Sequence, residues 1–197
     1  MATIAERLVA EDFFENEVFD NLELEGTELE GKDFVGCSFH NARLLKTRWQ
    51  GGRLEDCVFK GCDLTGMIPG GVALRGVDFS GCKLMGIDWS NLGTMPALSF
   101  SDCNLRYASF VGARLRKTQF TRCDLGEANF IDVDLAEAVF DACQLTGTNF
   151  ERCELRGASF AGCVDLQLDP TRNKVKGVSI PLEAAISLAA SFGMKVV

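Results

Sequence analysis

The fold is decided by residues 123–160, which read CDLGEANFIDVDLAEAVFDACQLTGTNFERCELRGASF. A large apolar residue returns at every fifth position of this stretch, alternating between leucine and phenylalanine from Leu125 to Phe160. A smaller residue, most often alanine or cysteine, stands two positions before each of these centres. Residues two apart point to the same side only in an extended chain, so each five-residue unit predicts a very short strand followed by a corner. A helix would need apolar spacings of three and four, which are missing.

The same spacing runs outward from Phe14 to Phe160, with a single inserted residue between positions 90 and 99. In two of the four sets made by taking every fourth centre, all the centres are the same residue type. One set is Phe19, Phe39, Phe59, Phe79, Phe100, Phe120, Phe140 and Phe160, and the next is Leu24, Leu44, Leu64, Leu84, Leu105, Leu125 and Leu145. This period predicts a four-sided turn of 20 residues, in which identical side chains stack from one turn to the next.

We therefore expect an all-β protein, a quadrilateral β-helix of about eight turns over residues 12–166. Residues 1–11 are expected to form an N-terminal cap. Residues 167–197 are expected to form a linker, a C-terminal α-helix and a tail.

The repeat resembles that of the pentapeptide-repeat family, whose units read A-(D/N)-L-x-x. The matching segments are GCDLTG (61–66), CDLGEANF (123–130), VDLAEAVF (133–140), CQLTGTNF (143–150) and CELRGASF (153–160). The resemblance covers residues 12–166 and implies a right-handed β-helix. The handedness comes from the resemblance alone.

The cysteine and histidine residues give little indication of a catalytic, redox or metal site. All nine cysteines occupy the inner position of a unit, and six of them form one column: Cys62, Cys82, Cys103, Cys123, Cys143 and Cys163. The column could bind metal or act in redox chemistry, or cysteine could be a small apolar residue that fills the inner position. Stacked parallel side chains do not converge on a metal ion, which favours this filler interpretation. His40 follows the centre Phe39 and should face outward, away from Cys37. No nucleophile, phosphate-loop or metal motif occurs, so we predict no enzyme, no cofactor and no metal.

Composition narrows the possible partners. The chain of 197 residues carries a net charge of −8, which argues against direct binding of nucleic acid or of an anionic membrane. Hydrophobic residues make up 47% of the chain, enough for a continuous core. No stretch predicts a membrane span or a signal peptide, so we expect a cytoplasmic protein with reduced thiols.

Two segments interrupt the repeat: MIPGG (67–71), with Pro69 at a centre, and NLGTMPA (91–97), with the insertion. Proline cannot donate to a strand ladder, so one interpretation is a local bulge or kink. The other interpretation is a loop that contacts a partner.

The last segment predicts a helix that starts at Ser179 or Ile180, has Pro181 in its first turn and ends at Gly193. This helix could cap the last turn, or cap it and also join a second chain. The expected dimer interface is Leu182, Ala185, Ile186, Leu188, Ala189 and Phe192. The terminal segment resembles that of Qnr, MfpA, AlbG and McbG proteins, which implies a homodimer through this end.

Charge is uneven along the chain. Residues 123–165 hold nine acidic and two basic residues, whereas residues 34–122 hold six acidic and twelve basic ones. The expected acidic partner surface is Asp124, Glu127, Asp132, Asp134, Glu137, Asp141, Glu151 and Glu154. These residues could simply keep a stacked β protein soluble, or they could mimic duplex DNA.

The resemblance implies the second of these roles, with DNA gyrase or topoisomerase IV as the partner and protection from quinolones or gyrase toxins as the result. The alternative is a structural or adaptor protein with an unrelated protein partner. The long loops of Qnr proteins are missing from this chain, and the basic stretch 34–122 imitates phosphate poorly.

Overall fold

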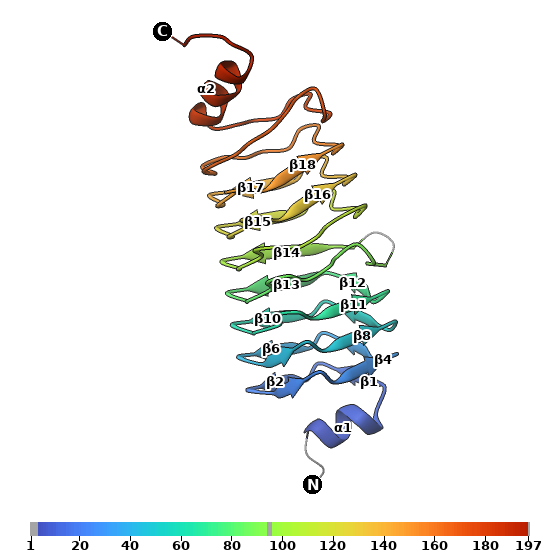
Figure 1. Ribbon diagram of the computed structural model, residues 1–197. Helices are drawn as coiled ribbons and strands as arrows, with labels where there is room; N and C mark the ends of the chain where they lie inside the picture. The colour runs from blue at the N-terminus through green and yellow to red at the C-terminus, as the bar shows by residue number, and fades with distance from the viewer. Residues whose placement is uncertain (1–3, 94–95, 197) are drawn as a thin grey trace.

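The computed structural model describes residues 4–93 and 96–196, and it is a straight stack of turns with one helix at each end (Figure 1). Helix α1 (Ile4–Ala10) lies before the first turn, and helix α2 (Leu182–Ser191) lies after the last one. All strand pairs are parallel and join residues about one turn apart in the sequence. The fold is a four-sided, right-handed β-helix: the repeat spacing predicts the four sides, and the family resemblance implies the handedness.

We name the four sides by the residues at their centres. The phenylalanine wall has the strands β2 (Val18–Asp20), β6 (Ser38–His40), β10 (Val58–Lys60), β13 (Val77–Ser80), β14 (Leu98–Ser101), β15 (Gln119–Thr121) and β17 (Val139–Asp141). The leucine wall has β3 (Glu23–Glu25) and β7 (Arg43–Leu45), and continues as single-residue bridges to Val164.

The tryptophan wall has β4 (Glu28–Glu30), β8 (Arg48–Gln50), β11 (Ile68–Gly70), β16 (Asn129–Ile131) and β18 (Asn149–Glu151). The fourth wall has β1 (Phe13–Glu15), β5 (Asp33–Val35), β9 (Arg53–Glu55) and β12 (Ala73–Arg75). It continues as bridges from Arg114 through Asp134 and Glu154 to Lys174.

The core is made of stacked identical side chains. Neighbouring rings of the phenylalanine wall lie 4.5 to 5.3 Å apart between centroids and are nearly parallel. The eight phenylalanines from Phe19 to Phe160 are therefore separated by seven full turns, which confirms the 20-residue period. The alanine and cysteine side chains expected inside are buried, including Cys37, Ala108 and Cys163.

The corners explain the polar residues of the repeat. The residue two positions after nearly every centre has a positive φ, for example 54° at Asn16 and 52° at Asn21. Glycine, asparagine and aspartate adopt this left-handed conformation most readily, and they hold most of these corners. Other residues, such as Lys46, Tyr107 and Arg122, are held in the same conformation by the pairing of successive turns.

The N-terminal end is closed by α1 and by a buried lysine. Leu8 of α1 is buried, and Arg7 lies 5.6 Å from the centroid of the Phe14 ring. Lys32 occupies an inner position, where its Nζ donates to the Asp12 carboxylate at 2.7 Å and to the Glu11 carbonyl oxygen at 2.8 Å. Of the expected cap at 1–11, residues 1–3 lie outside the described residues.

The two interruptions differ in structure. The bulge interpretation is wrong at 67–71, because β11 pairs with β8 in register and Pro69 lies buried opposite Trp49. The inserted residue is accommodated within 91–97, of which residues 94 and 95 lie outside the described residues. Before the insertion the Gly93 N–H donates to the Val72 carbonyl oxygen, and after it the Ala97 N–H donates to the Leu74 carbonyl oxygen.

The coil continues beyond the boundary that the repeat predicts at residue 166. Bridges join Glu154 to Lys174 and Ser159 to Ser179. Asn173 replaces an apolar residue at the inner position: its side chain donates to the Phe150 carbonyl oxygen and accepts the Cys153 N–H. Because Ser179 belongs to this last turn, α2 begins at Leu182 and not at Ser179 or Ile180.

Candidate protein-binding surfaces

The eight expected acidic residues lie on all four walls, not on one face. Asp124 belongs to the leucine wall, Asp141 to the phenylalanine wall and Glu151 to the tryptophan wall. Asp134 and Glu154 are bridged on the fourth wall. The corner residues are Glu127, Asp132 and Glu137, all with positive φ. The turns thus distribute one acidic stretch of sequence around the rod.

Five of the eight carboxylates are ion-paired with bases from neighbouring turns or units. Asp132 accepts two hydrogen bonds from Arg152, at 2.8 and 2.9 Å, and Arg152 also binds Glu151. Glu137 pairs with Arg116 and Lys117, Glu154 with Arg156 and Lys174, and Asp124 with Arg106. Glu127, Asp134 and Asp141 make no ion pair among the described residues.

Two of these pairs lower the pKa of the carboxyl group that they hold. The hydrogen bond from Arg152 holds the pKa of Asp132 below its usual value, and the bond from Arg156 does the same for Glu154. Such exposed pairs contribute little to stability, about 0 to 1 kcal/mol each. Their main effect is on the surface potential, because bases from outside residues 123–165, such as Arg116 and Lys174, neutralise carboxylates that a charge count over that block leaves unbalanced.

The cysteines lie inside the coil, as the filler interpretation expects. All nine are buried and free, and each sulfur contacts the carbonyl oxygen of a phenylalanine one turn earlier, as Cys62 contacts Phe39 at 3.2 Å. Burial raises the pKa of the Cys57 and Cys153 thiols to about 11, which disfavours the reactive thiolate. His40 lies on β6, facing outward between Asp20 and Lys60.

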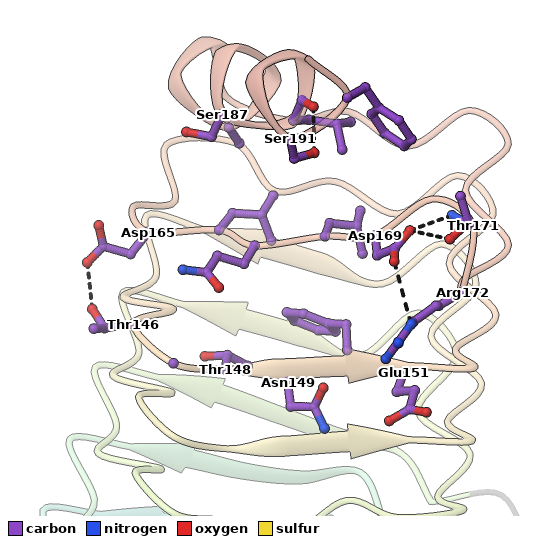
Figure 2. A pocket seen from close by; sticks show the side chains of 18 residues that line it. Thr146, Thr148, Asn149, Glu151, Asp165, Asp169, Thr171, Arg172, Ser187 and Ser191 are labelled. Atoms are coloured by element: carbon purple, nitrogen blue, oxygen red, sulfur yellow. Dashed lines mark hydrogen bonds and ion pairs between the residues drawn. The ribbon is translucent and has the colours of Figure 1, made fainter. Parts of the chain in front are cut away.

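The C-terminal end holds a cavity of about 910 Å³ between α2 and the last turns. Its lining includes Thr148, Asn149, Leu166, Leu188 and Phe192. Figure 2 shows Ser187 and Ser191 of α2 on the upper side of the cavity, facing the last turns across it. The helix therefore covers the end of the core without filling the space beneath it.

The helix leaves its apolar residues in solvent. No residue of α2 is fully buried, and the exposed fractions are 70% for Leu182, 41% for Ile186 and 54% for Phe192. Ala185, Leu188 and Ala189 are half-buried. In the following tail, Met194 and Val196 are also more than half exposed. The six residues expected at a dimer interface thus lie on one short, incompletely covered helix.

The four-sided β-helix is built from five-residue units, its core is largely apolar, and nearly all of its charged side chains lie on the surface. Such an architecture defines a class of binding scaffold. Residues 53–91 match the family model for pentapeptide repeats (8 copies), and residues 113–167 match the model for the pentapeptide repeat region. The chain is a pentapeptide-repeat protein. Proteins of this family are generally non-enzymatic structural or binding proteins.

Solved structures share the fold over nearly the whole chain. Full-length QnrB1, a plasmid-mediated fluoroquinolone resistance protein, is 16% identical with a TM-score of 0.71; the match covers 92% of this chain and 100% of QnrB1. HetL, a pentapeptide repeat protein involved in heterocyst differentiation regulation from the cyanobacterium Nostoc sp. strain PCC 7120, is 18% identical with a TM-score of 0.57 and coverages of 91% and 93%. At these identities the likeness establishes the fold alone.

The remaining comparisons add two findings. No curated protein matches this chain by sequence. Neither helix in the described part of the chain has the length and apolar character that a bilayer crossing requires.

Proposed function

We propose that this protein is a non-enzymatic solenoid that binds DNA gyrase or topoisomerase IV in the cytoplasm and protects the enzyme from quinolones or gyrase toxins. The observation that best supports this proposal is the match to QnrB1, a fluoroquinolone resistance protein, over that protein's whole length. A rigid rod with outward carboxylates suits a basic surface that otherwise binds DNA, because complementary potentials steer the two together.

A gyrase supercoiling assay with and without ciprofloxacin tests the proposal. We expect micromolar protein to inhibit supercoiling or to restore supercoiling in the presence of the drug. If neither effect is seen, the proposal is wrong and the adaptor role remains. That alternative is favoured by the match to HetL and by the ion pairs that occupy five of the eight carboxylates.

The unpaired carboxylates should matter most for DNA mimicry. The double variant Glu127→Lys/Asp141→Lys changes two exposed acids of the C-terminal half, and we expect its gyrase affinity at low salt to fall about tenfold or more. The matched control is Glu23→Lys/Glu30→Lys, which makes the same charge change on the first turn. Surface plasmon resonance at two salt concentrations measures both; equal affinities for the two variants would contradict mimicry by the C-terminal half.

We also propose that two chains join end to end through α2. Leu182 and Ile186 are exposed in the single chain, so replacing both by aspartate should leave a monomer. Size-exclusion chromatography with light scattering checks this, with Val18→Asp at the opposite end of the rod as the control for an exposed apolar residue. A monomeric natural protein at micromolar concentration would contradict the dimer.

A further inference from the structure

Over the C-terminal half of the coil the fourth wall is basic, whereas the other three walls are acidic. Over residues 98–177, the units of the fourth wall (113–117, 133–137, 153–157 and 173–177) carry six basic and three acidic residues. The other three walls carry four basic and eight acidic residues over the same turns. We call this surface the basic wall; its bases are Arg114, Arg116, Lys117, Arg156, Lys174 and Lys176.

The bases are brought together by the register of the coil. Bridges place Arg114 beside Asp134, Asp134 beside Glu154 and Glu154 beside Lys174. Stacked strands are about 4.8 Å apart, so these four turns span about 14 Å. Three of the six bases come from the single run 114–117, and the coil brings Arg156, Lys174 and Lys176 onto the same wall.

The acids of the basic wall lie beneath its bases. Glu154 binds both Arg156, at 2.6 Å, and Lys174, at 3.4 Å, and only 17% of its side chain is exposed. The two bases remain 61% and 76% exposed. Glu137 is likewise shared by Arg116 and Lys117. Two carboxylates thus engage four cations, while Arg114 and Lys176 make no ion pair among the described residues.

The surroundings limit what can bind. Towards the N-terminus the same wall is weakly acidic, with five acids (Asp12, Glu15, Asp33, Glu55 and Asp56) against three bases (Lys32, Arg53 and Arg75). A long DNA duplex or an anionic bilayer laid along this wall would extend over these acids and would be repelled there. A short acidic polypeptide fits within the patch, where six bases outnumber three acids.

We propose that the basic wall is a docking surface for a short acidic segment of a partner protein. Three of the carboxylates considered for DNA mimicry, Asp134, Glu137 and Glu154, lie on this wall, but the proposal does not rest on gyrase being the partner. Exposed bases at an interface act mainly through attraction at a distance, so the binding should be strongly salt-dependent.

Fluorescence anisotropy of a fluorescein-labelled peptide of ten glutamates tests the proposal with the full chain. We expect binding at 50 mM salt that weakens about tenfold or more at 300 mM. The variant Arg114→Glu/Arg116→Glu/Lys176→Glu should weaken it at least tenfold at 50 mM salt. Arg114→Lys/Arg116→Lys keeps the charge and should retain binding within about threefold, which separates loss of charge from loss of folding.

The matched control is Arg43→Glu/Lys60→Glu/Lys83→Glu, which makes the same charge change on the leucine and phenylalanine walls. It should bind the peptide within about threefold of the natural protein. The proposal is overturned if the peptide does not bind at 50 mM salt or if the control variant loses as much affinity as the basic-wall variant. It is equally overturned if a duplex of 12 base pairs binds as tightly as the peptide.

Discussion

Replacing Phe120 by alanine should destabilise the protein by about 3 to 5 kcal/mol, a large part of the 5 to 15 kcal/mol that typically holds a domain folded. Phe120 is fully buried in the middle of the coil, stacked on Phe100 at 5.1 Å and on Phe140 at 4.8 Å. It also meets the edges of Phe110 and Phe130. Its loss leaves a cavity that a repeating backbone cannot collapse to fill.

Two controls make the Phe120 result specific. Gln119→Ala changes the exposed neighbour on the same strand and should cost less than about 0.5 kcal/mol. Phe120→Leu places there the residue found at the centres of the leucine wall, and should cost less than about 1.5 kcal/mol. Guanidinium denaturation followed by circular dichroism measures all three variants. A Phe120→Ala cost below 1 kcal/mol would mean that the aromatic column is not the core.

Gly52→Ala should destabilise by about 3 kcal/mol or more, whereas Gly51→Ala should cost only about 1 to 2 kcal/mol. The two glycines have nearly the same φ, 65° and 62°, so an added Cβ strains the left-handed backbone equally at both positions. They differ in what that Cβ would meet. At Gly52 it would lie 2.2 Å from the Lys32 carbonyl oxygen and 2.8 Å from the Lys32 backbone nitrogen, whereas nothing lies within 4 Å at Gly51.

The Gly52 clash is with backbone, so it can be relieved only by moving the second and third turns apart. That movement would also disturb the Lys32–Asp12 pair at the N-terminal end. Thermal unfolding of the two variants side by side measures the difference. Equal melting temperatures would contradict the close approach of these two turns.

The period of the coil could be predicted from the sequence because each residue stacks on its own kind. The 20-residue recurrence of phenylalanine specifies the turn length, and the recurrence of cysteine specifies an inner position. Pro69 is harder to predict. Proline normally interrupts the hydrogen bonds between strands, but here β11 keeps its register with β8 and Pro69 lies opposite Trp49. Asn173 carries no apolar signal, so the last turn was missed.

The surface was predicted less well than the core. Counting charge in blocks along the chain treats neighbours in sequence as neighbours in space, but in this coil the neighbours are about 20 residues apart. Glu137 therefore pairs with Arg116 and Lys117, and Glu154 pairs with Lys174, although these bases lie outside the charge block 123–165. Writing the sequence in rows of 20 would have revealed these pairs and the basic wall. The position of α2 lies outside the repeat, so no period could predict it.

The spacing between turns can be measured directly by pulsed electron spin resonance. One spin label is placed at Ser38 through an unnatural amino acid, and the second in turn at Ser99, Gln119, Val139 and Ser159, all on the phenylalanine wall and in one register. We predict that the distance grows by about 4.8 Å with each step of 20 residues. Distances that do not grow evenly from Ser99 to Ser159 would contradict the four-sided coil, and with it every surface derived from it.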